Sequence, residues 1–152
     1  MKVKNVFSRR VYYISPNATL LEASRIIFGK NHKGIPVVDE SKKVVGFITE
    51  QDIMSQVFPK ASELMEDYIH EKDFEAMENN LRLILDKKVK SIMTKKVTTI
   101  HEDEPMLKAE SIMKLNEISR LPVVDNKKKL LGIISKGDIF RALVSRKARG
   151  FK

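Results

Sequence analysis

The chain has 152 residues, with 29 Lys and Arg against 20 Asp and Glu, a formal net charge of +9 and no Cys. A chain of this length can bury roughly 70% of its unfolded surface, so one compact module is expected and a multidomain enzyme is excluded. The absence of Cys excludes disulfide scaffolds, thiolate metal sites and Cys nucleophiles, and it is compatible with a reducing cytosol.

The first predicted elements are a short strand and a helix. Residues 11–14 are rich in residues that favour strands, and the apolar residues after them, such as Leu20 and Ala23, recur at helical spacing. Thr19 and Glu22 have the spacing of a capping box. This spacing predicts that the helix begins near Thr19.

A hairpin and a second helix follow. Residues 35–38 and 44–48 are runs rich in β-branched residues, and the polar residues 39–43 between them are typical of a turn. A helix is expected after Thr49, with Ile53 on its apolar face.

Residues 58–88 are mostly helical by pattern, because apolar residues recur there at helical spacing in two stripes. The stripes are formed by Leu64, Met65 and Tyr68, and then by Phe74, Met77, Leu81, Ile84 and Leu85. Two interpretations are open: a pair of helices that covers the core, or a dimer contact or adaptor surface for a partner.

The elements then recur 86 residues later. At this offset residues 3–54 and 89–140 share 17 identities in 52 pairs without a gap. The second copy carries Pro105, a residue suited to the first helical position, where the first copy carries Thr19. We therefore divide the chain into copy 1 (1–57), a helical insert (58–88), copy 2 (89–145) and a basic tail (146–152). A unit of about 50 residues buries too little to be secure alone, so we expect both copies to pack together as one module about a pseudo-twofold axis.

The most informative repeated peptide lies where the last strand of each copy meets the following helix, at residues 46–52 and 132–138. The N–H groups and the dipole at a helix start favour an anion, a hydroxyl can bond it, and an aspartate three residues on can accept both hydroxyls of a ribose. The candidate residues are Thr49 and Asp52 in copy 1, and Ser135 and Asp138 in copy 2.

The same spacing is that of a capping box that binds nothing, and this structural interpretation stays open. Two features favour a ligand: Asp replaces the usual Glu or Gln of a capping box, and the cap follows an apolar strand led by glycine, Gly46 or Gly132. Glycine there would let a ligand or a neighbouring backbone come close.

The doubled pattern of a helix, Pro-Val-Val-Asp, and Gly-x-Ile-Thr/Ser-x-x-Asp resembles the cystathionine-β-synthase (CBS) domain, and two copies in tandem are similar to a CBS-domain pair. The resemblance implies an α/β (α+β) fold of two β-α-β-β-α units. It also implies a regulatory, non-catalytic module that binds an adenosine-containing ligand, AMP, ADP, ATP or S-adenosylmethionine, in the clefts between the units. A disc-shaped homodimer is a further implication.

The resemblance assigns roles residue by residue. Asp52 and Asp138 match the family's ribose-binding aspartates, and Thr49 and Ser135 match its hydroxyls near ribose and phosphate. The positions that match the surroundings of the adenine are Ile35, Pro36, Leu121, Pro122, Tyr13, Ile14, Thr99 and Ile100.

The two copies differ in charge around this motif. Arg120, Lys136 and Gly137 stand in copy 2 where copy 1 has Gly34, Glu50 and Gln51. An arginine can hold a phosphate bidentately and a lysine acts as a point charge, so the second cleft is predicted to be the better phosphate site. Simple solvation of both side chains is the alternative.

No catalytic or metal site is predicted, because the three His lack ligand spacing and no nucleophile elbow, Walker loop or double-glycine fingerprint occurs. The sequence therefore predicts a ligand sensor that regulates an unidentified protein in trans. The alternative function is a nucleic-acid-binding protein that uses its basic surface, with nucleotide as a modulator, although aromatic residues are only 7% of the chain. A purely structural pair without a ligand is a third possibility.

The location of the protein is also predicted from what the sequence lacks. No apolar run reaches the roughly 18 to 20 residues of a membrane span, and the N-terminal residues lack the apolar stretch of a signal peptide. We therefore expect a soluble, cytoplasmic protein without a membrane partner. The dispersed Lys and Arg are compatible with a solvated surface or with a footprint for a polyanion.

Overall fold

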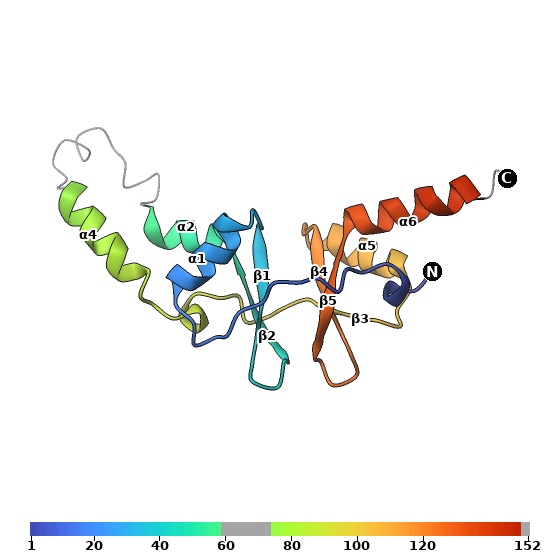
Figure 1. Ribbon diagram of the computed structural model, residues 1–152, viewed down its shortest axis with the longest axis horizontal. Helices are drawn as coiled ribbons and strands as arrows, with labels where there is room; N and C mark the ends of the chain where they lie inside the picture. The colour runs from blue at the N-terminus through green and yellow to red at the C-terminus, as the bar shows by residue number, and fades with distance from the viewer. Residues whose placement is uncertain (59–73, 150–152) are drawn as a thin grey trace. The chain divides into compact units, whose positions relative to one another are not determined.

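The computed structural model describes residues 1–58 and 74–149. Its elements in chain order (Figure 1) are η1 (Val3–Asn5), α1 (Leu20–Gly29), β1 (Gly34–Val38), β2 (Val44–Thr49), α2 (Glu50–Val57), α4 (Phe74–Ile84), η3 (Val89–Ser91), β3 (Ile100–His101), α5 (Met106–Leu115), β4 (Arg120–Val124), β5 (Leu130–Ser135) and α6 (Lys136–Arg149). The mixed α+β class predicted from the sequence is confirmed. No helix among the described residues has both the length and the apolar character that crossing a membrane requires.

The chain divides into two compact units. Unit 1 combines Met1–Val11, Val38–Val44 and Lys96–Lys152, and unit 2 combines Tyr12–Val37 and Val45–Lys95. Each unit has its own hydrophobic core. The core of unit 2 is formed by Ile14, Leu20, Ala23, Ile27, Ile35, Val37, Ile48, Ile53 and Val89.

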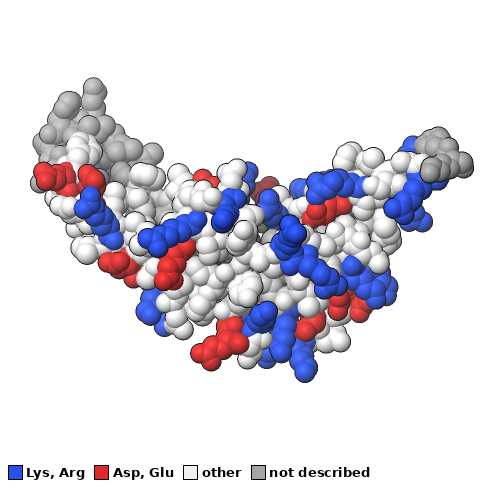
Figure 2. Space-filling view, viewed as in Figure 1, with Lys and Arg blue, Asp and Glu red and all other residues white. Residues whose placement is uncertain are grey.

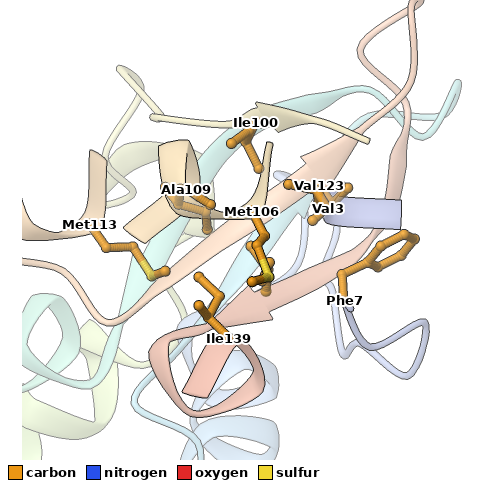
Figure 3. Close-up of a cluster of buried hydrophobic side chains, with 10 residues drawn as sticks. Val3, Phe7, Ile100, Met106, Ala109, Met113, Val123 and Ile139 are labelled. Atoms are coloured by element: carbon orange, nitrogen blue, oxygen red, sulfur yellow. The ribbon is translucent and has the colours of Figure 1, made fainter. Parts of the chain in front are cut away.

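In unit 1, β3, β4 and β5 form one sheet in that order, with β3 parallel and β5 antiparallel to β4. Helices α5 and α6 pack against this sheet and against each other. Their apolar residues converge on the strands in Figure 3, where Met106, Met113 and Ile139 lie in one cluster with Val123.

Helix α1 begins as the sequence predicts. The Thr19 hydroxyl accepts a hydrogen bond from the Glu22 N–H (3.2 Å), and the Glu22 carboxylate accepts one from the Thr19 N–H (3.3 Å). The capping box thereby satisfies two donors that a helix start leaves unpaired.

Both hairpins are closed by an aspartate. Oδ1 of Asp125 accepts hydrogen bonds from the backbone N–H groups of Lys127 (2.8 Å) and Lys129 (2.9 Å), and Asp39 forms the same pair of bonds in the first hairpin. The N–H of Lys129, with that of Lys127, lowers the pKa of Asp125 below its ordinary value, because hydrogen bonds to the charged form favour it. The expected turns at 39–43 and 125–129 are confirmed.

The leading segment of each copy packs in the unit that holds the body of the other copy. The Val3 N–H donates to the Glu104 carbonyl (2.8 Å), and Val3 and Phe7 lie in the core of unit 1, as Figure 3 shows. In unit 2 the Val89 N–H donates to the Ala18 carbonyl at the same distance. The two contacts are equivalent at the 86-residue offset, so the repeat extends to this exchange of segments.

The strand expected at residues 11–14 is shorter than predicted, because only Ile14 pairs, in a parallel bridge with Val37. The Ile14 N–H donates to the Pro36 carbonyl (3.1 Å), and the next bond toward Tyr12 would need an N–H at Pro36, which proline lacks. Pro36 could have indicated this limit from the sequence, but the high strand propensity of residues 11–14 favoured a longer strand.

Two other expectations change at the ends of helices. Pro105 is the N-cap of α5, one position before the first helical residue at which we expected it. The basic tail is not separate from copy 2 at its start, because residues 146–149 continue α6.

Helix α4 carries part of the second predicted stripe in the insert, whereas Leu64, Met65 and Tyr68 lie outside the described residues.

Candidate ligand site

In copy 1 the predicted motif lies at the junction of β2 and α2. The Thr49 hydroxyl accepts a hydrogen bond from the Asp52 N–H (3.0 Å), and Oδ2 of Asp52 accepts one from the Thr49 N–H (2.9 Å). The two residues therefore form a complete capping box. We expected Asp in place of Glu to disfavour a capping box, and this expectation is wrong, because the shorter carboxylate reaches the Thr49 N–H.

The junction of β5 and α6 in copy 2 has the same geometry. Oδ2 of Asp138 accepts from both the N–H and the hydroxyl of Ser135, each at 2.8 Å, and the Asp138 N–H donates to the Ser135 hydroxyl (3.1 Å). The structural role that the sequence left open is therefore present in both copies.

Capping uses only one oxygen of each carboxylate. Oδ1 of Asp52 accepts no hydrogen bond from any described residue, and Oδ1 of Asp138 accepts one from Arg141 (2.5 Å). An ionised carboxylate offers about four lone-pair sites, so Oδ1 can accept further donors while Oδ2 holds the helix start. A sugar hydroxyl is a donor of this kind.

The residues predicted to border an adenine lie mostly in the cores. Ile35 is 2% exposed and Leu121 is fully buried, and the side chains of both pack inside their own units. These two segments offer a ligand mainly backbone groups, while Tyr13 is 44% exposed. The remaining positions are Pro36, Pro122, Ile14 and Ile100, which are buried, and Thr99, which is half-buried.

The backbone of the basic residues predicted for phosphate lies beside the motif in copy 2. Arg120 pairs with Ser135 across β4 and β5, and the Lys136 N–H donates to the Ser119 carbonyl (3.2 Å). Gly137 follows in the first turn of α6. In copy 1, Gly34 stands where copy 2 has Arg120, and a Cβ there would lie 2.6 Å from the ring of Phe47. An arginine could not simply replace Gly34.

Sequence reasoning missed Arg141, which is bound to the candidate ribose-binding carboxylate. The signal was available, because Asp138 and Arg141 are three residues apart on a predicted helix and such pairs are neighbours on its surface. Among the described residues, no group of three or more His, Cys, Asp or Glu side chains is placed to hold a metal ion.

Comparisons with known proteins agree with this architecture. The sequence model of the CBS domain matches residues 3–58 and 89–145. The uncharacterized protein MJ1232 of Methanocaldococcus jannaschii is 34% identical over 94% of this chain, which spans only 40% of that relative's length.

Solved structures show the same fold. The CBS-domain pair of protein MJ0100, crystallised with 5′-methylthioadenosine and S-adenosyl-L-methionine, is 30% identical, with a TM-score of 0.67 and coverage of 96% of this chain and 98% of that one. CBSX2 in complex with AMP has a TM-score of 0.73 with coverage of 96% and 98%, and at 22% identity it shows the fold alone. The repeat, the two matched segments and these structures establish that the chain belongs to the CBS domain family, with two copies of the domain.

Proposed function

We propose that this chain is a non-catalytic regulatory module that binds an adenosine-containing ligand, most favourably AMP, ADP or ATP, with S-adenosylmethionine as a further candidate. The observation that carries the proposal is the pair of junctions at which a carboxylate caps a helix with one oxygen and leaves its other oxygen outside the cap. The adenosine ligands bound by the CBS-domain pair of MJ0100, 30% identical to this chain, support the choice of ligand class.

Each proposed ligand group has a partner in the junction. Oδ1 of Asp52 or Asp138 accepts hydrogen bonds from the ribose hydroxyls, and the hydroxyl of Thr49 or Ser135 lies beside them. Basic side chains near Ser135 attract a phosphate by charge. The ligand therefore adds hydrogen bonds to a capping box that stays intact.

Ligand binding regulates a partner only if the ligand prefers one state of the module, since equal affinity for two states shifts nothing. A cytoplasmic homodimer that acts on a second protein is the form in which we propose this regulation. Exposed apolar side chains on α5 and α6, including Leu107 (55% exposed) and Phe140 (67%), support an interface with another protein surface.

A thermal-shift panel tests the proposed function. AMP, ADP, ATP and S-adenosylmethionine are added to the unaltered chain, to Asp52→Asn, to Asp138→Asn and to the double variant. Asparagine can still accept the cap hydrogen bond but lacks the charge, so the fold should survive while ligand protection is lost. A ligand at a hundredfold excess over its dissociation constant should stabilise the unaltered chain by about 2.7 kcal/mol.

Asp86→Asn is the matched control, because it removes an exposed carboxylate outside both junctions. It should retain the whole ligand-induced shift. A double variant that is protected as well as the unaltered chain would overturn the proposal. Absence of any shift, combined with RNA or DNA binding that falls steeply with added salt, would favour the nucleic-acid function instead.

A further inference from the structure

The first turn of α6 carries an ion pair that has no equivalent in copy 1. Nη2 of Arg141 donates to Oδ1 of Asp138, and the side chains are 71% and 17% exposed. A Cβ added to Gly137 would lie 3.2 Å from Nη1 of Arg141, so the guanidinium folds back over the start of the helix. Figure 2 shows basic side chains both at the start and toward the end of α6, at the right of the view.

Copy 1 has different residues at the positions equivalent to Arg141 and Gly137. Ser55 replaces Arg141, and its hydroxyl donates to the Asp52 carbonyl (3.0 Å) instead of to a carboxylate. Gln51 replaces Gly137. Oδ1 of Asp52 therefore has no arginine beside it, whereas Oδ1 of Asp138 has its charge neutralised by one.

A sugar that reaches Asp138 must share Oδ1 with Arg141 or displace it. Displacement costs little, because an ion pair with one largely exposed partner is weakly held. A neutral nucleoside offers the released guanidinium no new partner. A phosphate does, because a guanidinium binds phosphate oxygens bidentately and with its full charge.

We propose that Arg141 determines the charge preference of the copy 2 site. It pairs with Asp138 before the ligand binds and moves to the ligand's phosphate afterwards, so this site selects phosphorylated adenosine ligands over neutral ones. Copy 1 lacks this selection and accepts uncharged or cationic adenosine ligands as readily as phosphorylated ones. The inference rests on the proposed function, since it concerns the same carboxylate.

Calorimetric titration with AMP and with adenosine tests this role. All proteins carry Asp52→Asn, so that binding reports copy 2, and Arg141→Gln is compared with unaltered Arg141. AMP should bind about tenfold more weakly to the Gln variant, because a charge-assisted hydrogen bond is lost. Adenosine should bind equally well or up to about threefold more tightly, because the competitor for Oδ1 is gone.

Arg146→Gln is the control, because it removes the same charge from an exposed position of the same helix. It should change neither affinity by more than about twofold, since salt screens distant exposed charges. Circular dichroism melting checks that each variant is folded.

The two possible failures can be distinguished. If Arg141→Gln weakens AMP and adenosine by the same factor, Arg141 only positions Asp138 and the inference is overturned. Unchanged affinities for both ligands overturn it as well. If the chain with Arg141 intact binds neither ligand, and no ligand of the thermal-shift panel protects the fully unaltered chain, the proposed function fails and the inference fails with it.

Discussion

Gly132 in β5 has no room for a side chain. A Cβ at this position would meet the Ser8 carbonyl oxygen and would lie 2.6 Å from the Phe7 ring. The Ser8 backbone cannot move away easily, because its N–H and carbonyl each form a 2.9 Å hydrogen bond with Ile133. The close approach that the sequence predicted for this glycine is therefore made by the leading segment of the chain itself.

Gly46 is the equivalent position in copy 1 and serves as the matched comparison. At Gly46 the nearest atoms belong to the side chain of Met93, which is flexible and can repack. We expect Gly132→Ala to lower the free energy of unfolding by about 2–3 kcal/mol, and Gly46→Ala by less than about 1 kcal/mol. Urea denaturation of the two variants measures both losses. Equal losses would show that the Ser8 backbone is not a rigid neighbour.

The positions of the candidate ribose carboxylates were predictable from the sequence, but the partners of their individual oxygens were not. The spacing of Thr49 and Asp52 predicted both a cap and a ligand site, and the structure contains the cap. The spacing could not show which oxygen would remain available, because that depends on the rotamer of the aspartate. The difference between the copies, with Arg141 bound at Asp138, likewise depends on a side-chain conformation.

Each hairpin turn holds a lysine in the left-handed backbone region, Lys42 with φ of 63° and Lys128 with φ of 62°. An L-residue with a Cβ pays a steric cost of about 1–2 kcal/mol in this region. Glycine has no steric cost there, and its additional loss of backbone entropy on folding is smaller than that. The polar composition of the turns predicted their position but not this conformation, since glycine or asparagine is the residue that usually marks it.

Replacing these lysines should therefore stabilise the fold. We expect Lys42→Gly and Lys128→Gly each to raise the free energy of unfolding by about 0.5–1 kcal/mol, as measured by urea denaturation. Lys127→Gly is the control, because Lys127 is in the same turn without a positive φ and glycine there should lower stability by a similar amount. A loss of stability in Lys128→Gly as large as that in Lys127→Gly would show that the backbone of Lys128 is not strained.

Across the whole chain, the repeat allowed most of the fold to be predicted. One offset placed both hairpins and both pairs of helices, since each copy confirmed the pattern of the other. The exchange of the leading segments was not predictable in the same way. Val3 and Val89 are both apolar and both match at the offset, so the sequence cannot say in which unit each is buried.

We propose that Asp52 and Asp138 bind the ribose hydroxyls of an adenosine ligand in addition to capping their helices. The most direct measurement compares the affinity of the unaltered chain for AMP with that for 2′,3′-dideoxy-AMP by calorimetry. Loss of two hydrogen bonds to a charged acceptor should weaken binding by at least about thirtyfold. Equal affinity for the two ligands would show that the carboxylates serve the helix starts alone and do not bind the ribose.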